Sequence, residues 1–201
     1  MLAGLAADNI TNTMAYSLYL SPASLDNPST ANSQIIFGGI DPSLYTGPLI
    51  EFETYESTLN EHVYDDFFFA QLTHIAVEDR TTGETSDIPV YIPVLIDSGT
   101  EQILLPTAQA DAIAAIANAT YHEDPDVLSN NYFICQCSNI PVEATVNFTF
   151  FDTLDVIVPF SAMVNNDTEV EGQCIIPISY EAHPGGSILV YLHLRQPRLI
   201  M

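Results

Sequence analysis

One stretch of the sequence, residues 94–106, constrains the fold more than any other. A run of β-forming residues delivers the carboxylate of Asp97 into a Ser98-Gly99-Thr100 turn, and a second apolar run leads from that turn to Pro106. Glycine is favoured where the backbone bends sharply, and the two hydroxyls can hydrogen-bond an ionised carboxylate. An acid at the end of a buried strand costs free energy unless it is satisfied or used. The pattern alone therefore fits a structural turn and a catalytic or ligand-binding acid equally well.

The rest of the chain is typical of short strands. Aromatic and β-branched runs bounded by turn residues predict strands at residues 14–20, 34–37, 49–55, 64–78 (one or two strands), 88–96, 132–135, 144–151, 154–159 and 174–178. The polar segment 79–87 predicts a hairpin turn with Gly83 as its pivot. The alanine-rich residues 106–117 predict a single helix with Thr107 as its N-cap. The sequence thus predicts a mostly-β domain.

The charge balance excludes several kinds of partner. The 201 residues carry a formal net charge of −23, with Arg80, Arg195 and Arg198 as the basic residues. Such a chain repels the phosphates of nucleic acids and anionic lipid surfaces, and no apolar stretch is long enough to span a bilayer. Because hydrophobic residues make up 47% of the chain, it is not a disordered acidic segment. Protonation of carboxylates relieves self-repulsion, so we expect the protein to suit acidic pH.

Three upstream segments add specificity to the Asp97 motif. Tyr-Ser-Leu-Tyr-Leu at residues 16–20, Ile-Phe-Gly-Gly-Ile-Asp at 36–41 and Tyr-Thr-Gly at 45–47 precede it in a characteristic order. They resemble the crossover between the lobes of the pepsin-type aspartic proteases, and Ile96 to Thr100 with Pro106 resembles the second Asp-Thr/Ser-Gly segment of that family. The match runs over residues 14–189, with the secreted fungal branch the most similar.

The resemblance implies a fold and a division of the chain. It implies a mostly-β, pepsin-like acid-protease fold whose lobes are closed double-psi β-barrels. Residues 1–60 would be the end of the N-terminal lobe with the crossover strands, and residues 61–201 a truncated C-terminal lobe.

The resemblance also implies an activity, aspartic-type endopeptide hydrolysis at acidic pH without a metal or cofactor. In that family two aspartates share a proton and activate a water. Asp97 would be the second-lobe aspartate, Thr100 would support its carboxylate, and Ser98 and Gly99 would belong to the turn that joins the lobes. Glu101 departs from the family, which usually has Ser or Thr there. The partner would be a peptide or protein substrate in extended conformation.

The first Asp-Thr-Gly segment of the family is not in this sequence, and Asp41 is expected to belong to a turn instead. A lone aspartate cannot be both acid and base, so an N-terminal lobe would be required and the chain alone is expected to be inactive. Val190 stands where the family has glycine, which suggests an altered reading frame near Leu189 and an aberrant C-terminus. Two alternatives stay open: a non-catalytic peptide-binding or inhibitor-like protein on a pepsin scaffold, and a homodimer that pairs two copies of Asp97.

The chain has three cysteines. By resemblance, Cys137 and Cys174 form the second-lobe disulfide, which would stabilise the lobe by roughly 2–4 kcal/mol. Cys135 is then either a buried thiol or the true partner of Cys174 in place of Cys137. A zinc site is not expected, because Cys135 and Cys137 have no matching histidine pair. The histidines are predicted to be surface or loop residues: His62, His74, His122, His183 and His193.

Four Asn-x-Thr sequons indicate a secretory history. They are Asn9, Asn118, Asn147 and Asn166. The first seven residues lack the basic region of a signal peptide. We therefore expect an extracellular or secretory-pathway glycoprotein whose signal peptide is absent from this sequence.

Overall fold

The computed structural model describes residues 2–19, 33–45, 48–52, 57–59, 62–64, 68–97, 102–123, 131–165, 170–180 and 188–190. The chain divides after Glu51 into two compact units. The second unit is Phe52–Leu192. Each is described by itself. The expected boundary after residue 60 stays a prediction.

The first unit contains a helix and a small hairpin. Helix α1 (Leu2–Ala7) precedes strands β1 (Tyr16–Tyr19) and β2 (Gln34–Phe37), which pair antiparallel. Gly38 ends β2 with a φ of +75°, and a Cβ there would lie 2.7 Å from the Cβ of Thr11, so only glycine fits. A 3₁₀ turn, η2 (Pro42–Leu44), follows. Residues 49–52 are not a strand, so the strand predicted over 49–55 is wrong as far as it is described.

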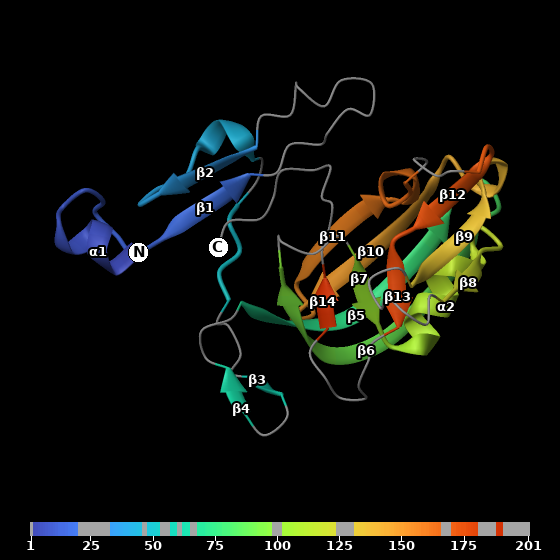
Figure 1. The fold of residues 1–201 in the computed structure, drawn as a ribbon, viewed down its shortest axis with the longest axis horizontal. Coiled ribbons are helices and arrows are strands. Elements are labelled where there is room, and N and C mark those ends of the chain that lie inside the picture. Colours follow the sequence, from blue (N-terminus) through green and yellow to red (C-terminus); the bar gives the residue numbers. More distant parts are fainter. Residues whose placement is uncertain are drawn as a thin grey trace. The chain divides into compact units, whose positions relative to one another are not determined.

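The second unit is built on a seven-stranded sheet with the order β11-β10-β5-β6-β14-β7-β13 (Figure 1). Its strands are β5 (Phe69–Asp79), β6 (Glu84–Ile96), β7 (Ile103–Leu105), β10 (Ala144–Phe150), β11 (Leu154–Pro159), β13 (Ile178–Tyr180) and β14 (Ile188–Val190). The predicted hairpin between β5 and β6 is confirmed, with Gly83 at a φ of +75° in its turn. Strand β6 begins four residues before the predicted Ile88.

Two smaller sheets and a helix complete the unit. One sheet has the strand order β12-β9-β8 and consists of β12 (Gln173–Ile176), β9 (Tyr132–Gln136) and β8 (Thr120–His122). The other pairs β3 (Ser57–Leu59) with β4 (His62–Tyr64). Two further 3₁₀ turns are η4 (Cys137–Asn139) and η5 (Phe160–Ala162). The predicted mostly-β class is confirmed, although none of the described sheets closes into a barrel.

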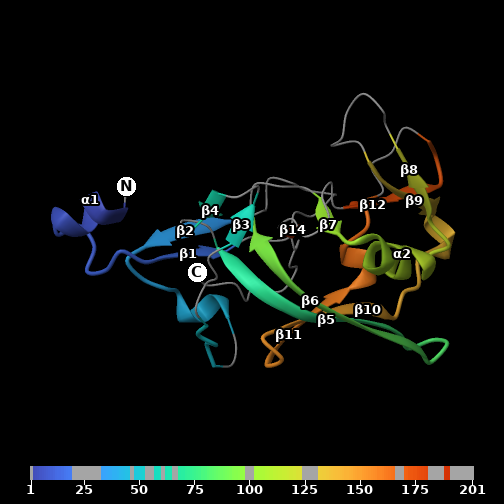
Figure 2. The ribbon, with the colours of Figure 1, turned by 90° about the horizontal axis from the view of Figure 1, so that it is seen from below.

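The predicted helix is α2 (Thr107–Ala115), which packs against β13, β6 and β7. Figure 2 shows it at the same end of the second unit as β8, β9 and β12. Its N-cap is Pro106, and no side chain caps it, so the prediction of Thr107 as N-cap is wrong by one residue. Proline before the first turn costs nothing there, because the first N–H groups of a helix have no intrahelical partner. The helix buries Ala110, Ile113 and Ala114 against the sheet.

The core of the second unit lies on one face of the large sheet. Strand β10 alternates strictly, with Ala144, Val146, Phe148 and Phe150 buried and the residues between them half-buried. This is the period of two that a sheet with one covered face produces. The largest fully buried side chains are Phe148, Phe160, Leu72, Ile75, Leu105, Ile113, Ile176 and Ile178.

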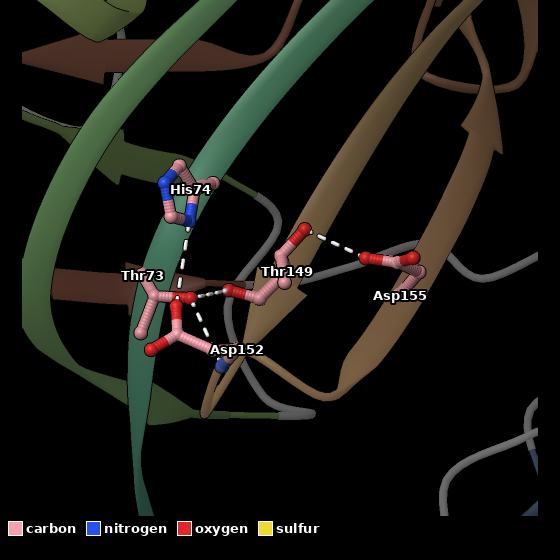
Figure 3. Close-up of polar contacts among 5 residues, drawn as sticks. All are labelled: Thr73, His74, Thr149, Asp152 and Asp155. Atoms are coloured by element: carbon pink, nitrogen blue, oxygen red, sulfur yellow. Dashed lines mark hydrogen bonds and ion pairs between the residues drawn. The ribbon is translucent and has the colours of Figure 1, made fainter.

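A buried threonine holds the β10–β11 turn onto β5 (Figure 3). At Thr73 the register of β5 shifts against both β10 and β6. The Thr73 hydroxyl donates to the carbonyl oxygen of Thr149 at 3.0 Å and accepts from the backbone N–H of Asp152 at 3.2 Å. Thr73 is 2% exposed, whereas Asp152 is exposed, so the two bonds are part-buried. The hydroxyl therefore replaces ladder bonds that the bulge removes.

Replacing Thr73 with valine is expected to destabilise the second unit by about 1–3 kcal/mol, because the valine has the same shape but removes two part-buried hydrogen bonds of about 0.5–1.5 kcal/mol each. The free energy of unfolding in urea measures this. Thr85→Val, at an exposed position of β6, is the control and should change stability by less than about 0.5 kcal/mol. Equal effects of the two substitutions would contradict the role of the Thr73 hydroxyl.

Candidate active site

The aspartate singled out by its sequence lies at the end of the longest strand. Strand β6 runs for 13 residues to Ile96, whose N–H donates to the carbonyl of Phe68 at 2.9 Å, and Asp97 follows it at once. Val94, three residues earlier, is fully buried, whereas Asp97 is half-buried. The hairpin therefore fixes the backbone before Asp97 and leaves its carboxylate partly accessible.

Strand β14 lies between the two strands that flank the Asp97 turn. It pairs parallel with β6, with Val190 opposite Ile96, and antiparallel with β7, with Val190 opposite Ile103. Sequence reasoning did not predict β14, because its signal is three apolar residues with no alternation.

The residues that follow the turn are also held by hydrogen bonds. Gln102 donates from Nε2 to the carbonyl oxygen of Asn131 at 3.1 Å, and the N–H of Ile103 donates to the carbonyl of Pro177 at 2.9 Å. Ile103 is buried, and β7 continues in parallel pairing with β13. Ser98, Gly99 and Thr100 lie outside the described residues, so their roles around the carboxylate stay predictions.

Asp41 has a structural use in the first unit. Its carboxylate accepts from the N–H of Ser43 at 2.9 Å and from the Ser43 hydroxyl at 2.7 Å, which caps η2. The hydrogen bonds from the hydroxyl and then the N–H of Ser43 lower the pKa of Asp41. A carboxylate held ionised in this way is a poor general acid, in agreement with the predicted turn.

A disulfide joins Cys137 to Cys174, the pair that the family resemblance implied. Cys135 is a buried free thiol, and burial raises its pKa. The disulfide connects η4, at the end of β9, with β12, and so closes the small sheet that packs beside β13.

An aromatic cluster supports β13, the strand next to β7. The ring of Tyr180 stacks on Tyr121 with centroids 4.1 Å apart, and Phe133 meets both rings edge-on. The Tyr180 hydroxyl donates to Oδ1 of Asp111 on α2 at 2.7 Å. Burial first, and then the hydrogen bond to Asp111 and its charge, raise the pKa of Tyr180 to about 12. The cluster ties α2 to the sheet that carries the site.

The raised pKa predicts how stability depends on alkaline pH. Since the folded-state pKa lies above the ordinary value of about 10, the contribution of Tyr180 is complete below pH 10 and is lost as the pH rises toward 12. Tyr180→Phe should lower the urea midpoint at pH 7, and the difference from the wild type should shrink between pH 10 and 12. A difference that stays constant over this range would contradict the assignment. Tyr91→Phe, at a side chain that is 58% exposed, is the control.

The described histidines all lie on strands, with His62 on β4, His74 on β5 and His122 on β8. His122 is exposed, in agreement with the predicted surface or loop position, and His74 is half-buried. His74 contacts Asp152 (Nδ1 to Oδ1, 3.5 Å), but the side chains are 32% and 59% exposed, so this contact adds little stability (Figure 3). Within the described part of the chain, no group of three His, Cys, Asp or Glu side chains could hold a metal ion.

The sequons differ in their surroundings. Asn9 and Asn118 are exposed and lie in turns at positive φ. Asn147 is half-buried on β10, which lies between β11 and β5 in the sheet, and its Oδ1 is buried without a hydrogen-bond partner. Asn166 lies outside the described residues.

We predict glycans at Asn9 and Asn118 but not at Asn147, because a glycan on β10 would have to displace the neighbouring strands or their side chains. Glycopeptide mass spectrometry of protein secreted from a fungal host measures this. Full occupancy of Asn147 in folded protein would contradict the prediction.

The second unit is mostly β and Asp97 follows the end of its strand β6, and the match to a protein family gives the class of protein. Residues 2–197 match the family of eukaryotic aspartyl proteases. The chain belongs to this family, whose members are pepsin-like aspartic endopeptidases, and the resemblance found from its sequence is confirmed.

The relatives that share this family are fungal. The chain is 30% identical over 174 residues to barrierpepsin from Saccharomyces cerevisiae, covering 84% of this chain and 27% of that protein. It is 30% identical over 156 residues to candidapepsin-2 from Candida parapsilosis (78% and 32% covered) and 31% identical over 163 residues to secreted aspartic protease 8 from Candida albicans (81% and 34%). The chain thus spans about a third or less of the length of these relatives.

Proposed function

We propose that this chain supplies the second catalytic aspartate, Asp97, of a secreted aspartic endopeptidase. The observation that carries the proposal is the place of Asp97 at the end of β6, where β14 and β7 pair beside it within a chain of this family. An aspartate that follows a fixed strand but is itself only half-buried is accessible to water and to a substrate.

The mechanism needs a second carboxylate. Two facing aspartates share one proton, because like charges at short range do not both ionise. The ionised member takes a proton from water as that water attacks the peptide carbonyl, and the protonated member donates to the carbonyl oxygen. Asp97 performs one of these roles, and an N-terminal lobe supplies the partner. The substrate is a protein or peptide in extended conformation, and the optimum pH is acidic.

Secretion is part of the same proposal. A relative of this chain is named a secreted aspartic protease, and the sequons and the disulfide suit an oxidising compartment. The described residues contain no helix that is long and apolar enough to cross a membrane.

The experiment compares the chain alone with the chain joined to a first lobe. One protein is the 201-residue chain, and the other carries the first lobe of candidapepsin-2 ahead of it. Both are incubated with an unstructured protein at about pH 4, after cooperative unfolding has shown that each is folded. We expect the joined protein to cleave the substrate and the 201-residue chain by itself not to cleave it.

Two outcomes would overturn the proposal. Cleavage by the chain alone, with a rate that rises as the square of its concentration, would mean that two copies of Asp97 form the dyad. Tight peptide binding by the joined protein without any cleavage would favour the non-catalytic, inhibitor-like alternative.

A further inference from the structure

The three cysteines of the chain lie at neighbouring backbone positions of β9, η4 and β12. In the antiparallel pairing of β12 with β9, Cys174 lies directly opposite Cys135. The Sγ of Cys135 is 3.9 Å from the carbonyl oxygen of Cys174, and both residues are buried. Cys174 is at the same time bonded to Cys137, two residues beyond Cys135. The free thiol is therefore next to a disulfide rather than isolated.

The strand register gives Cys174 two possible disulfide partners, Cys135 opposite it and Cys137 two residues further on. Directly opposite residues of an antiparallel pair have Cα atoms about 4.5–5.5 Å apart, which lies within the range of about 4.4–6.8 Å that disulfides span. The present disulfide has a Cα separation of 5.0 Å. The two possible bonds close loops with sequence separations of 37 and 39 residues, so their loop-closure entropies are nearly equal.

We propose that Cys135, Cys137 and Cys174 form one thiol–disulfide exchange site, in which Cys174 alternates between Cys137 and Cys135 and the released Cys137 thiol reacts with a low-molecular-weight disulfide. In the first step Cys135 loses its proton, its sulfur forms a bond to Sγ of Cys174, and the bond from Cys174 to Cys137 breaks with Cys137 leaving as a thiolate. In the second step this thiolate attacks one sulfur of the small disulfide and expels the other as a thiolate.

The three cysteines differ in how easily a dissolved disulfide can reach them. Cys135 and Cys174 are buried, whereas Cys137 opens η4 and is half-buried. A small disulfide in solution therefore meets Cys137 more readily than Cys135, but only after the bond has moved. Burial raises the pKa of the Cys135 thiol, so its thiolate is scarce and the first step is slow at neutral pH.

The test incubates the folded chain at about pH 8.5 with oxidised glutathione, quenches with acid, and locates the adduct and the remaining disulfide by peptide mass spectrometry. We expect glutathione on Cys137 together with a bond between Cys135 and Cys174, at a rate that increases about tenfold per pH unit from pH 7 to the test pH. Cys135→Ala is the matched control, because it keeps the disulfide but has no attacking thiol. It should give no adduct. An adduct on Cys135, or none on the wild-type chain, would overturn the proposal.

A second measurement removes the present partner. Cys137→Ala expressed under oxidising conditions should contain a Cys135–Cys174 disulfide and keep a melting temperature within a few degrees of the wild type. Cys174→Ala, which can form neither intrasheet bond, should melt lower than both. Two free thiols in folded Cys137→Ala would contradict the exchange site.

Discussion

Replacing Asp97 with asparagine is expected to lower kcat of the enzyme assembled with its first lobe by at least about 10²–10⁴-fold. Asparagine has nearly the same shape as aspartate but cannot take up or share a proton, so the water is no longer activated. KM should change little, because peptide substrates are held mainly by main-chain bonds and side-chain pockets rather than by the dyad. Steady-state hydrolysis of a peptide across pH 3–7 provides both constants.

The control for this prediction lies on the same strand. Asp87 is exposed on β6, ten residues before Asp97, and Asp87→Asn removes one negative charge without touching the strand end. It should leave kcat and its pH profile unchanged. Asp97 is not part of the dyad if the Asp97→Asn variant keeps more than about a tenth of the wild-type kcat and the Asp87→Asn variant lowers kcat by a similar amount.

Truncating Phe148 to alanine is expected to destabilise the second unit by about 3–5 kcal/mol. Phe148 is 0% exposed on β10, which is paired on both sides, with β5 and with β11. A loss of this size is a large part of the stability of a domain, so the urea midpoint should fall sharply. The midpoint of cooperative unfolding measures it.

Ile157→Ala tests whether the loss comes from burial. Ile157 is the partner of Asn147 on the neighbouring strand β11 and is 50% exposed. Its truncation should cost less than about 1 kcal/mol, since little apolar surface is removed from the interior. Comparable losses from the two substitutions would mean that β10 does not form the centre of this core.

The local sequence pattern was enough to predict an element wherever neighbouring residues determine the backbone conformation. The alternation in residues 144–151 predicted β10 to within one residue, and Gly83 marked the β5–β6 turn, because side-chain period and positive φ are properties of the local chain. The same reasoning failed for residues 49–52, which alternate but form no strand. Alternation shows only that a segment could be half-buried, and a strand forms only if a partner strand pairs with it.

The family and its candidate catalytic residue follow from the sequence by itself. The Asp97 segment and the order of the upstream motifs are sufficient to indicate the aspartic proteases, because the combination resembles that family more specifically than any one motif does. Only the tertiary structure decided what lies beside them. It inserted β14 between β6 and β7, set Thr73 under the β10–β11 turn, and placed Cys174 opposite Cys135 while bonding it to Cys137. These are pairings between residues far apart in the chain, and no local pattern specifies which distant strand packs against which.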